Sequence, residues 1–531
     1  MQTATFLSSR RRGSIAAGLA ILLASTPLLA QSGQAPASAP PARPASMQAP
    51  GPVVRLSMQE AVDMSLETNL GLKAQKLNPH MAAEDLASAR AAFIPSLSSS
   101  FSRNTNASVS TNFAQSSLST ISSNSTGVSA GLNQALPWYG GNYQLNWSSQ
   151  RSETTAYSTF NPQLTSRLSA TFNQPLMRGL SVDSARQNVK ISTRALEIAD
   201  VNLRQQALAT ERAVRSAYLS LIGALENQKV ARQNLDVAQD SLRNTQARVG
   251  VGTQAPNDIY SVEADVAVNE QRLISAETNI IDAQDSLRVL VLDPARPDYW
   301  TVTIEPSDVI QITPQQIDVD AAIRNALANR TDLITERKQI EITVLNAEVL
   351  HDSTRMSANA QVSYSANGVS GTQLTYGSGF PPEILNQSSR AYTGALGDTF
   401  TNTNPSWTYG VLIGYPLGRS AQEAQYARTK LDRQQQETNL RNNELQVAES
   451  VRGAARRVET LFRQLQALQK SREAQEHNLD AAQKKFAVGF SSTFELSQIQ
   501  RDVANAKLGE LLGRISYNQA LIDLQFVQLI R

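Results

Sequence analysis

The chain has 531 residues, of which 41% are apolar, 6% aromatic and 18% charged. Its 48 Lys and Arg nearly balance its 46 Asp and Glu, and a net charge of +2 gives no field that favours a nucleic acid or an anionic surface as partner. The absence of cysteine excludes disulfides, thiolate metal sites, cysteine nucleophiles and the acylated cysteine of a lipoprotein.

The first 30 residues are predicted to be an export signal that the mature protein lacks. Three arginines, Arg10–Arg12, precede an apolar run from Ile15 to Ala24, and a cleavage point follows Ala30. The run is shorter than the ~20 apolar residues that a membrane-spanning helix needs. Residues 31–52 are rich in Ala and Pro and are expected to be a disordered linker. The mature chain is expected either to be soluble or to cross a membrane with β-strands.

The rest of the sequence consists of two similar repeats in tandem, and this repeat determines the predicted fold. Three motifs recur in the same order, at shifts of 261, 241 and 237 positions. The matched pairs are Leu56–Leu72 with Ile317–Leu333, Gln174–Leu176 with Tyr415–Leu417, and Val251–Gly252 with Val488–Gly489. The first repeat is assigned to residues 53–310 and the second to residues 311–531.

Each repeat is predicted to contain a helix, a set of β-strands and a long helical hairpin. In the first repeat these are residues 57–92, strands within 97–176, and 183–292. In the second they are residues 319–354, strands within 358–417, and 421–529. Apolar residues at a sustained seven-residue spacing indicate coiled-coil packing in the hairpins, for example Ile259, Val266, Leu273, Ile280 and Leu287. An arm of roughly 67 residues extends on the order of 100 Å at ~1.5 Å per residue.

The predicted strands alternate apolar and polar residues, as in Tyr143, Leu145 and Trp147 or in Trp407, Tyr409 and Val411. Between the first two motifs, the first repeat holds 20 more residues than the second, and these include a further alternating pair around Pro137–Gly141. We interpret them as one longer or interrupted strand pair, which gives four strands per subunit. Six strands per subunit, and an eighteen-stranded barrel, stay open as the alternative.

The motifs that stand out in this arrangement are Phe93–Leu97, the two Pro-Leu strand exits, and the hairpin tips Arg248–Thr253 and Lys485–Phe490. With these motifs the sequence resembles the TolC family of outer-membrane efflux and secretion ducts, over nearly all of the chain from residue 53. The resemblance implies a fold that combines α-helices with a β-barrel. Three subunits would share a twelve-stranded antiparallel outer-membrane β-barrel, continuous with a long periplasmic α-helical coiled-coil barrel. Four strands alone leave open edges that lipid cannot satisfy, so other subunits must complete the barrel.

The resemblance further implies a function and a set of partners. The protein is expected to be the passive exit duct of a tripartite efflux pump in the outer membrane of a Gram-negative bacterium. Its partners would be a periplasmic adaptor, an inner-membrane pump and outer-membrane lipid. A duct for type I protein secretion is the alternative within the class. A surface adhesin with a coiled-coil stalk is the alternative outside it, and the two returning hairpins argue against that reading.

The hairpin tips are the first candidate site. Gly250, Gly252 and Gly489 turn the chain between antiparallel helices, and this alone explains their presence. The resemblance adds a docking surface for the adaptor, formed by Val251, Gly252, Thr253, Val488, Gly489 and Phe490.

Two acidic residues just inside the tips, Asp258 and Glu495, are the candidates for a periplasmic gate. Each begins a returning helix, where a carboxylate is stabilised by the helix N-terminus whatever its function. Repeated in three subunits, Glu495 would form an acidic ring that favours cations.

Enzymatic chemistry is not expected. His80, His351 and His477 fall on separate helical segments without a second metal ligand at a suitable spacing. Neither a catalytic triad nor a phosphate-binding loop is present at a recognisable spacing, so we predict no cofactor, no metal and no enzyme.

Overall fold

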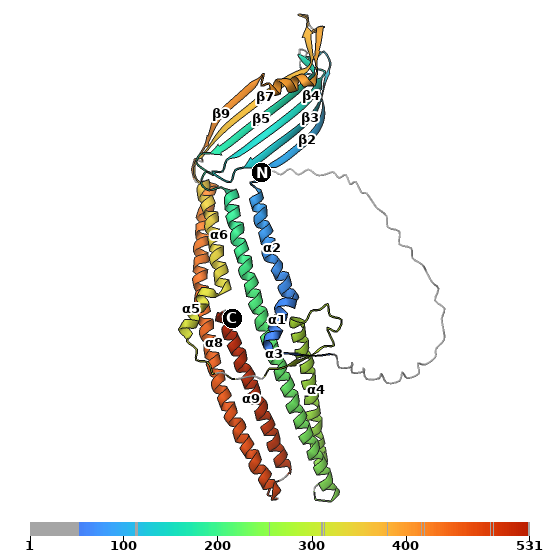
Figure 1. Ribbon diagram of the computed structural model, residues 1–531, viewed down its shortest axis with the longest axis vertical. Helices are drawn as coiled ribbons and strands as arrows, with labels where there is room; N and C mark the ends of the chain where they lie inside the picture. Colours follow the sequence, from blue (N-terminus) through green and yellow to red (C-terminus); the bar gives the residue numbers. More distant parts are fainter. Residues whose placement is uncertain are drawn as a thin grey trace, which may run out of the picture. The chain divides into compact units, whose positions relative to one another are not determined.

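The computed structural model describes residues 52–111, 115–253, 255–308, 312, 314–379, 381–415, 417–418, 420–488, 490–491 and 493–528. The expected export signal and nearly all of the expected linker therefore lie outside the described residues. Long helices and one large sheet make up the described chain (Figure 1).

Two helices of 67 residues each, α3 (Ser184–Gly250) and α8 (Ala421–Ala487), are the longest described elements. Each of them turns back into a shorter helix at the tip end, α4 (Asp258–Val291) and α9 (Thr493–Gln528). Toward the sheet they pack against the helices α2 (Leu70–Ala91) and α6 (Thr331–Ser353). Because α3 also packs against α9, the two hairpins lie side by side.

The expected helices 57–92 and 319–354 are each divided in two. A break at Asn69 separates α1 (Met58–Thr68) from α2, and a break at Arg330 separates α5 (Val319–Asn329) from α6. The prediction of one continuous helix at each place was wrong, because the backbone leaves the helical conformation at Asn69 and at Arg330, where the ψ angles are 120° and 127°. The Asn69 side chain accepts a hydrogen bond from the Leu72 amide at 3.0 Å. Two hydrogen bonds from the Arg330 guanidinium reach Asp332 in the first turn of α6.

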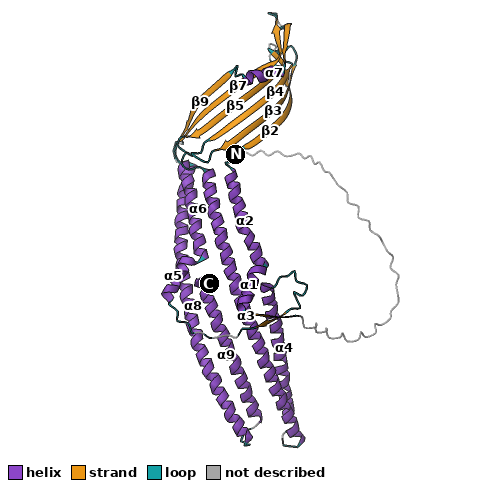
Figure 2. Cartoon of the chain, in the orientation of Figure 1, coloured by secondary structure: helices purple, strands orange, loops and turns teal. Residues whose placement is uncertain are grey.

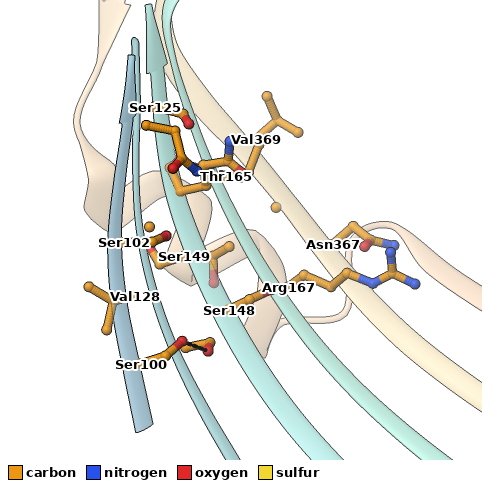
Figure 3. Close-up of a pocket in the computed structure, with 16 residues that line it drawn as sticks. Ser100, Ser102, Ser125, Val128, Ser148, Ser149, Thr165, Arg167, Asn367 and Val369 are labelled. Atoms are coloured by element: carbon orange, nitrogen blue, oxygen red, sulfur yellow. Dashed lines mark hydrogen bonds between the residues drawn. The ribbon is translucent and has the colours of Figure 1, made fainter. Parts of the chain in front are cut away.

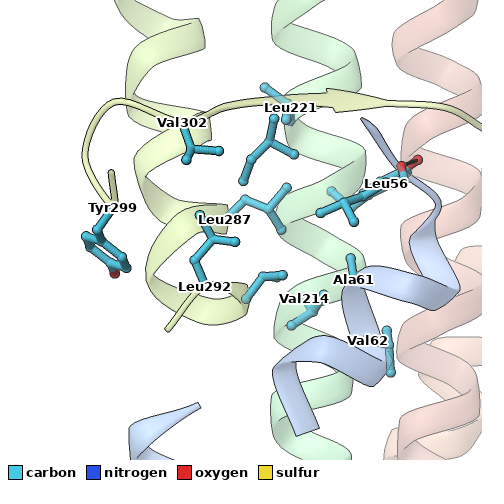
Figure 4. Packing of buried hydrophobic residues seen from close by; sticks show 12 residues of the cluster. Leu56, Ala61, Val62, Val214, Leu221, Leu287, Leu292, Tyr299 and Val302 are labelled. Atoms are coloured by element: carbon cyan, nitrogen blue, oxygen red, sulfur yellow. Dashed lines mark hydrogen bonds between the residues drawn. The ribbon is translucent and has the colours of Figure 1, made fainter. Parts of the chain in front are cut away.

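The main apolar core lies where α1 crosses the α3–α4 hairpin (Figure 4). Leu221 and Leu287 are fully buried in it, and Tyr218 donates a hydrogen bond to the Leu56 carbonyl at 2.9 Å. A parallel pair of short strands, β1 (Val53–Leu56) and β6 (Thr303–Pro306), closes this core. The start of the first repeat and the link between the repeats are thereby tied to the hairpin.

The large sheet has seven described strands, all paired antiparallel (Figure 2). In chain order they are β2 (Ser96–Val109), β3 (Thr120–Ala135), β4 (Asn142–Thr154), β5 (Phe160–Pro175), β7 (Ser357–Tyr376), β8 (Ile384–Arg390) and β9 (Pro405–Gly414). The order in the sheet is β2-β3-β4-β5-β7, and both β9 and β8 pair with β7. The short helix α7 (Tyr392–Phe400) lies between β8 and β9 in the chain.

The expectation of four strands per subunit was wrong. The first repeat alone supplies four strands, because Pro137–Gly141 is a tight turn between two full strands and not an interruption of one. The Leu136 amide donates to the Gly141 carbonyl at 2.8 Å, and Tyr139 and Gly140 adopt φ angles of 55° and 65°. The second repeat contributes the long strand β7, together with β9, which pairs with Ser357–Ala366 of β7, and the short β8, which pairs with Gly371–Tyr376.

None of the helices in the described part of the chain combines the length and the apolar character that crossing a bilayer requires.

Candidate functional site

One face of the sheet is polar and hollowed. Residues in register across five strands, Ser100, Ser129, Ser148, Arg167 and Asn367, lie on this face. They line a hollow of about 520 Å³ whose other walls are mostly Ser, Thr, Asn and Gly (Figure 3). Hydroxyl groups link neighbouring strands here, for example Ser100 and Ser129 at 2.8 Å. Such a face suits contact with water.

The opposite face is apolar and solvent-exposed. One row in register across the sheet consists of Leu97, Leu132, Leu145, Ala170, Tyr364 and Trp407. A second row adds Tyr143, Phe172, Val362 and Tyr409. Exposure is large for several of these side chains, at 79% for Leu97, 57% for Trp407 and 71% for Tyr409. So large an exposed apolar surface on a single chain needs a partner or lipid to cover it.

Helix α7 covers the end of this apolar face that is remote from the long helices. It packs on β7 and β5, where Thr399 donates a hydrogen bond to the Ser166 carbonyl at 3.0 Å. Gly368 permits this contact, because a Cβ atom there would lie 1.9 Å from the Ala395 carbonyl oxygen. The apolar band of the sheet therefore ends beneath α7. Helix α7 was not predicted, because its residues lie within the segment 358–417 that was assigned to strands.

The two hairpin tips share one hydrogen bond that closes the end of the long helix, from an amide to the carbonyl five residues before it. In the first tip the Thr253 amide donates to the Arg248 carbonyl at 2.9 Å and the Gly252 amide donates to Val249 at 3.0 Å. These two hydrogen bonds form a Schellman motif, and Gly252 supplies its left-handed residue with a φ angle of 76°. In the second tip the Phe490 amide donates to the Lys485 carbonyl at 2.9 Å. Gly489 lies outside the described residues.

The tips present apolar side chains to solvent. Exposed fractions are 75% for Val251, 69% for Val488 and 84% for Phe490. Thr253 is exposed as well, although its hydroxyl donates to the Arg248 carbonyl at 2.9 Å. The described members of the predicted docking surface are therefore accessible.

The two candidate gate acids occupy different surroundings. Asp258 is the first residue of α4 and lines a hollow of about 530 Å³ between the two hairpins, together with Asp265, Phe494 and Arg501. Glu495 lies in the first turn of α9 and accepts a hydrogen bond from Ser491 at 2.9 Å. Among the described residues, Asp258 is part of the wall of this hollow and Glu495 is not.

An ion pair in the same hollow joins one hairpin to the other. Arg501 of α9 contacts the carboxylate of Asp265 in α4, and both side chains are at least half-buried. The Gln498 side chain holds the other end of the Arg501 guanidinium at 2.9 Å. Sequence reasoning missed this pair, because its members are 236 positions apart on helices whose contact no local pattern reveals.

Other ion pairs join helices nearer the sheet or within one hairpin. Glu197 of α3 contacts Lys338 of α6, and this hydrogen-bonded ammonium group holds the pKa of Glu197 below its usual value. Glu510 of α9 contacts Arg472 of α8 and Arg514. Burial alone would raise the pKa of Glu510, but the two guanidinium groups outweigh it and lower the pKa.

Within the described residues, no group of three or more His, Asp or Glu is arranged to hold a metal ion. The three histidines lie apart, and His351 contacts the ring of Tyr426 at 5.1 Å between centroids.

The chain matches one protein-family model and is similar in fold to several solved structures. The family model described as outer membrane efflux protein matches residues 140–291 and 322–527, which is more than half of the chain. No curated protein sequence matches the chain.

Several solved structures have a similar fold. The outer membrane channel CmeC of Campylobacter jejuni superposes with a TM-score of 0.64 at 14% identity, covering 89% of this chain and 85% of that one. The outer membrane protein VceC of Vibrio cholerae has a TM-score of 0.60 at 14% identity, covering 89% and 95%. The outer membrane channel MtrE of Neisseria gonorrhoeae has a TM-score of 0.59 at 16% identity, covering 89% and 88%. At these identities the likeness concerns the fold.

Proposed function

The chain belongs to the outer membrane efflux protein family, and from that premise we propose that three copies of it form the exit duct of a tripartite efflux pump. Proteins of this family are passive channels of the Gram-negative outer membrane, so the chain is a duct and not an enzyme. The trimer, the adaptor contact at the tips and the gate described below are the parts that we propose.

The observation that carries the proposal is the sheet with one polar and one apolar face. A barrel closed from such sheets would present Leu97, Leu145 and Trp407 to lipid and Ser148, Arg167 and Asn367 to a water-filled lumen. The apolar band carries Tyr364, Trp407 and Tyr409, and the Trp407 ring contacts the rings of both tyrosines. Aromatic rings of this kind favour the interface between lipid and water.

The long hairpins support a periplasmic tunnel beneath this barrel. Helices of 67 residues extend on the order of 100 Å from the sheet. Their tips carry small residues and exposed apolar side chains, which suits docking of the helical tips of a periplasmic adaptor. An inner-membrane pump would then drive cargo through the adaptor into the duct.

The gate is proposed to lie at the hollow between the hairpins. Opening the tunnel would require α4 and α9 to move apart, a rigid-body displacement of coiled coils. Asp265 and Arg501 link these helices and oppose that movement. Asp258 and Glu495 would place carboxylates near the opening and favour cations there.

A substitution at a tip tests the adaptor contact. Phe490→Asp puts a charge on a side chain that is 84% exposed, so the duct should still assemble while docking fails. We expect loss of efflux of a fluorescent dye from cells that carry the matching adaptor and pump, with unchanged amounts of assembled duct. The control is Leu385→Asp in β8, a 70% exposed side chain on a strand of the large sheet, which should leave efflux intact. Normal efflux by Phe490→Asp would contradict the tip as docking site.

A further inference from the structure

Three described strands of the large sheet have a partner on one side only: β2 at one edge, and β9 and the short β8 at the other, where they pair with different parts of β7. Strand β2 pairs with β3 alone, and β9 pairs with β7 alone. All fourteen residues of β2 and all ten of β9 are exposed in the single chain. Each strand therefore presents a row of backbone N–H and C=O groups without a partner strand among the described residues.

These two edges cannot stay open in a protein that crosses a membrane. Every unsatisfied backbone group in hydrocarbon is costly, so spanning sheets must close. From this edge arrangement we propose that β9 of one subunit pairs with β2 of the next, and that three subunits so joined close a barrel of eighteen strands. The inference rests on the proposed trimeric duct and fixes its strand number and its seam.

The directions of the strands allow this closure. The six strands β2, β3, β4, β5, β7 and β9 alternate in direction, so the even number brings β2 and β9 of neighbouring subunits together antiparallel. Their ends also match. Strand β2 begins just after α2 and β9 ends just before α8, so Ser96 and Gly414 both lie at the helical end of the sheet.

The faces of the two edge strands agree as well. In β2 the residues Leu97 and Phe101 lie on the apolar face, and in β9 that face carries Trp407, Tyr409, Val411 and Ile413. An antiparallel seam that pairs odd-numbered with odd-numbered residues makes the apolar band continuous from one subunit to the next. A slip by one residue would turn one strand's apolar side chains into the lumen, so only every second register is possible.

A twelve-stranded trimer would have to close on β4 and leave β2 and β3 out of the barrel. The structure opposes this, because β4 has no free edge. Thirteen residue pairs from Ser123 to Ala135 join β3 to β4, and β5 occupies the other side of β4. The apolar and polar faces also continue without a change of register from β4 through β3 to β2.

The strand number sets the width of the duct. With strands about 4.8 Å apart and tilted about 40°, twelve strands enclose a ring about 24 Å across and eighteen a ring about 36 Å across. Barrels of this larger size leave an aqueous channel. The inferred duct would therefore pass wider cargo through the outer membrane than a twelve-stranded one.

Disulfide cross-linking tests the seam directly, because the chain has no cysteine of its own. Ser99→Cys in β2 is combined in turn with Tyr409→Cys, Val411→Cys and Ile413→Cys. These three positions lie on the same face of β9, and each would stand opposite Ser99 in a different allowed register. After oxidation, one of these variants should give a covalent ladder that ends at three subunits. Ser99→Cys with Leu412→Cys, on opposite faces, is the matched control and should give none.

A second series places the cysteine in β4, as Ser149→Cys with the same three positions in β9. Cross-linking in this series, or a ladder that ends at two subunits, would overturn the eighteen-stranded barrel while leaving the duct itself in place. Trimers in detergent without cross-links in either series would overturn the seam. A wild-type protein that is monomeric in detergent would refute the trimeric duct. Electron-microscopic averages of the wild-type particle seen along its axis give the ring diameter independently of any variant.

Discussion

Breaking the ion pair between the hairpins should open the periplasmic end of the duct. Asp265 and Arg501 join α4 to α9, with side-chain exposures of 39% and 16%. A partly exposed, charge-assisted pair of this kind contributes about 1 kcal/mol. If three subunits open together, Arg501→Gln removes about 3 kcal/mol of closing energy. At 1.36 kcal/mol per factor of ten, the ratio of open to closed channels should rise about a hundredfold.

Single-channel recording of the purified protein in planar lipid bilayers measures this ratio as the fraction of time spent conducting. Asp265→Asn should act like Arg501→Gln, and the exchanged pair Asp265→Arg with Arg501→Asp should restore much of the closed state. The control is Arg472→Gln, which removes a guanidinium that links α8 to α9 within one hairpin, while Glu510 keeps its contact with Arg514. An open fraction that changes less than threefold in Arg501→Gln, or equally in Arg472→Gln, would refute the role of the Asp265–Arg501 ion pair in closing the duct.

Three further predictions concern stability and the tips. Leu287→Ala empties a fully buried site and should cost about 2–5 kcal/mol in unfolding free energy, whereas Val268→Ala at a 47% exposed site should barely lower the melting temperature. The pKa of Glu197 is lowered in the folded chain, so its contact with Lys338 stabilises the fold fully at a pH above the ordinary value of 4.5, and this stability is lost as the pH falls through the lower folded pKa. Glu197→Gln should therefore flatten the fall of the melting temperature with decreasing pH below 4.5. An unchanged slope would contradict this. Gly252→Ala places a Cβ on a residue with a φ angle of 76° and should strain the first tip by about 1 kcal/mol. The tip of this variant should therefore be cut by a protease faster than the tip of Gly250→Ala, because Gly250 is helical and a Cβ added there meets no other atom.

Much of the helical part could be predicted from the sequence, because long periodic patterns determine long helices. Heptad residues such as Leu273 and Leu287 are buried in the structure. The breaks at Asn69 and Arg330 were missed because each depends on one capping side chain or one ion pair, and neither alters the apolar period on both sides.

The strand number could be predicted less well. The alternation in Val128–Leu132 and in Tyr143–Trp147 was visible, but an interrupted strand and a tight hairpin share the same pattern. Only the turn geometry at Tyr139 and Gly140 separates the two. Helix α7 was missed because its position depends on packing against Gly368 and Ser166 and not on a pattern of its own.

The positions of the tips could be predicted from the glycines and from the repeat, and at the first tip Gly252 supplies the left-handed residue that ends α3. The ion pair between Asp265 and Arg501 could not be predicted. Asp265 and Arg501 come from different repeats, and their contact depends on how the two hairpins pack. Neither residue stands at a helix end or in a motif that marks it.

The central claim is that the protein is a trimeric duct in the outer membrane. Its most direct test is the gel mobility of the outer-membrane fraction with and without heating in detergent. The account predicts a band at three subunit masses in the unheated sample that converts to one at a single subunit mass, 57.6 kDa less the export signal, on boiling. A monomer in both samples, or recovery of the protein in the soluble periplasmic fraction, would contradict the account.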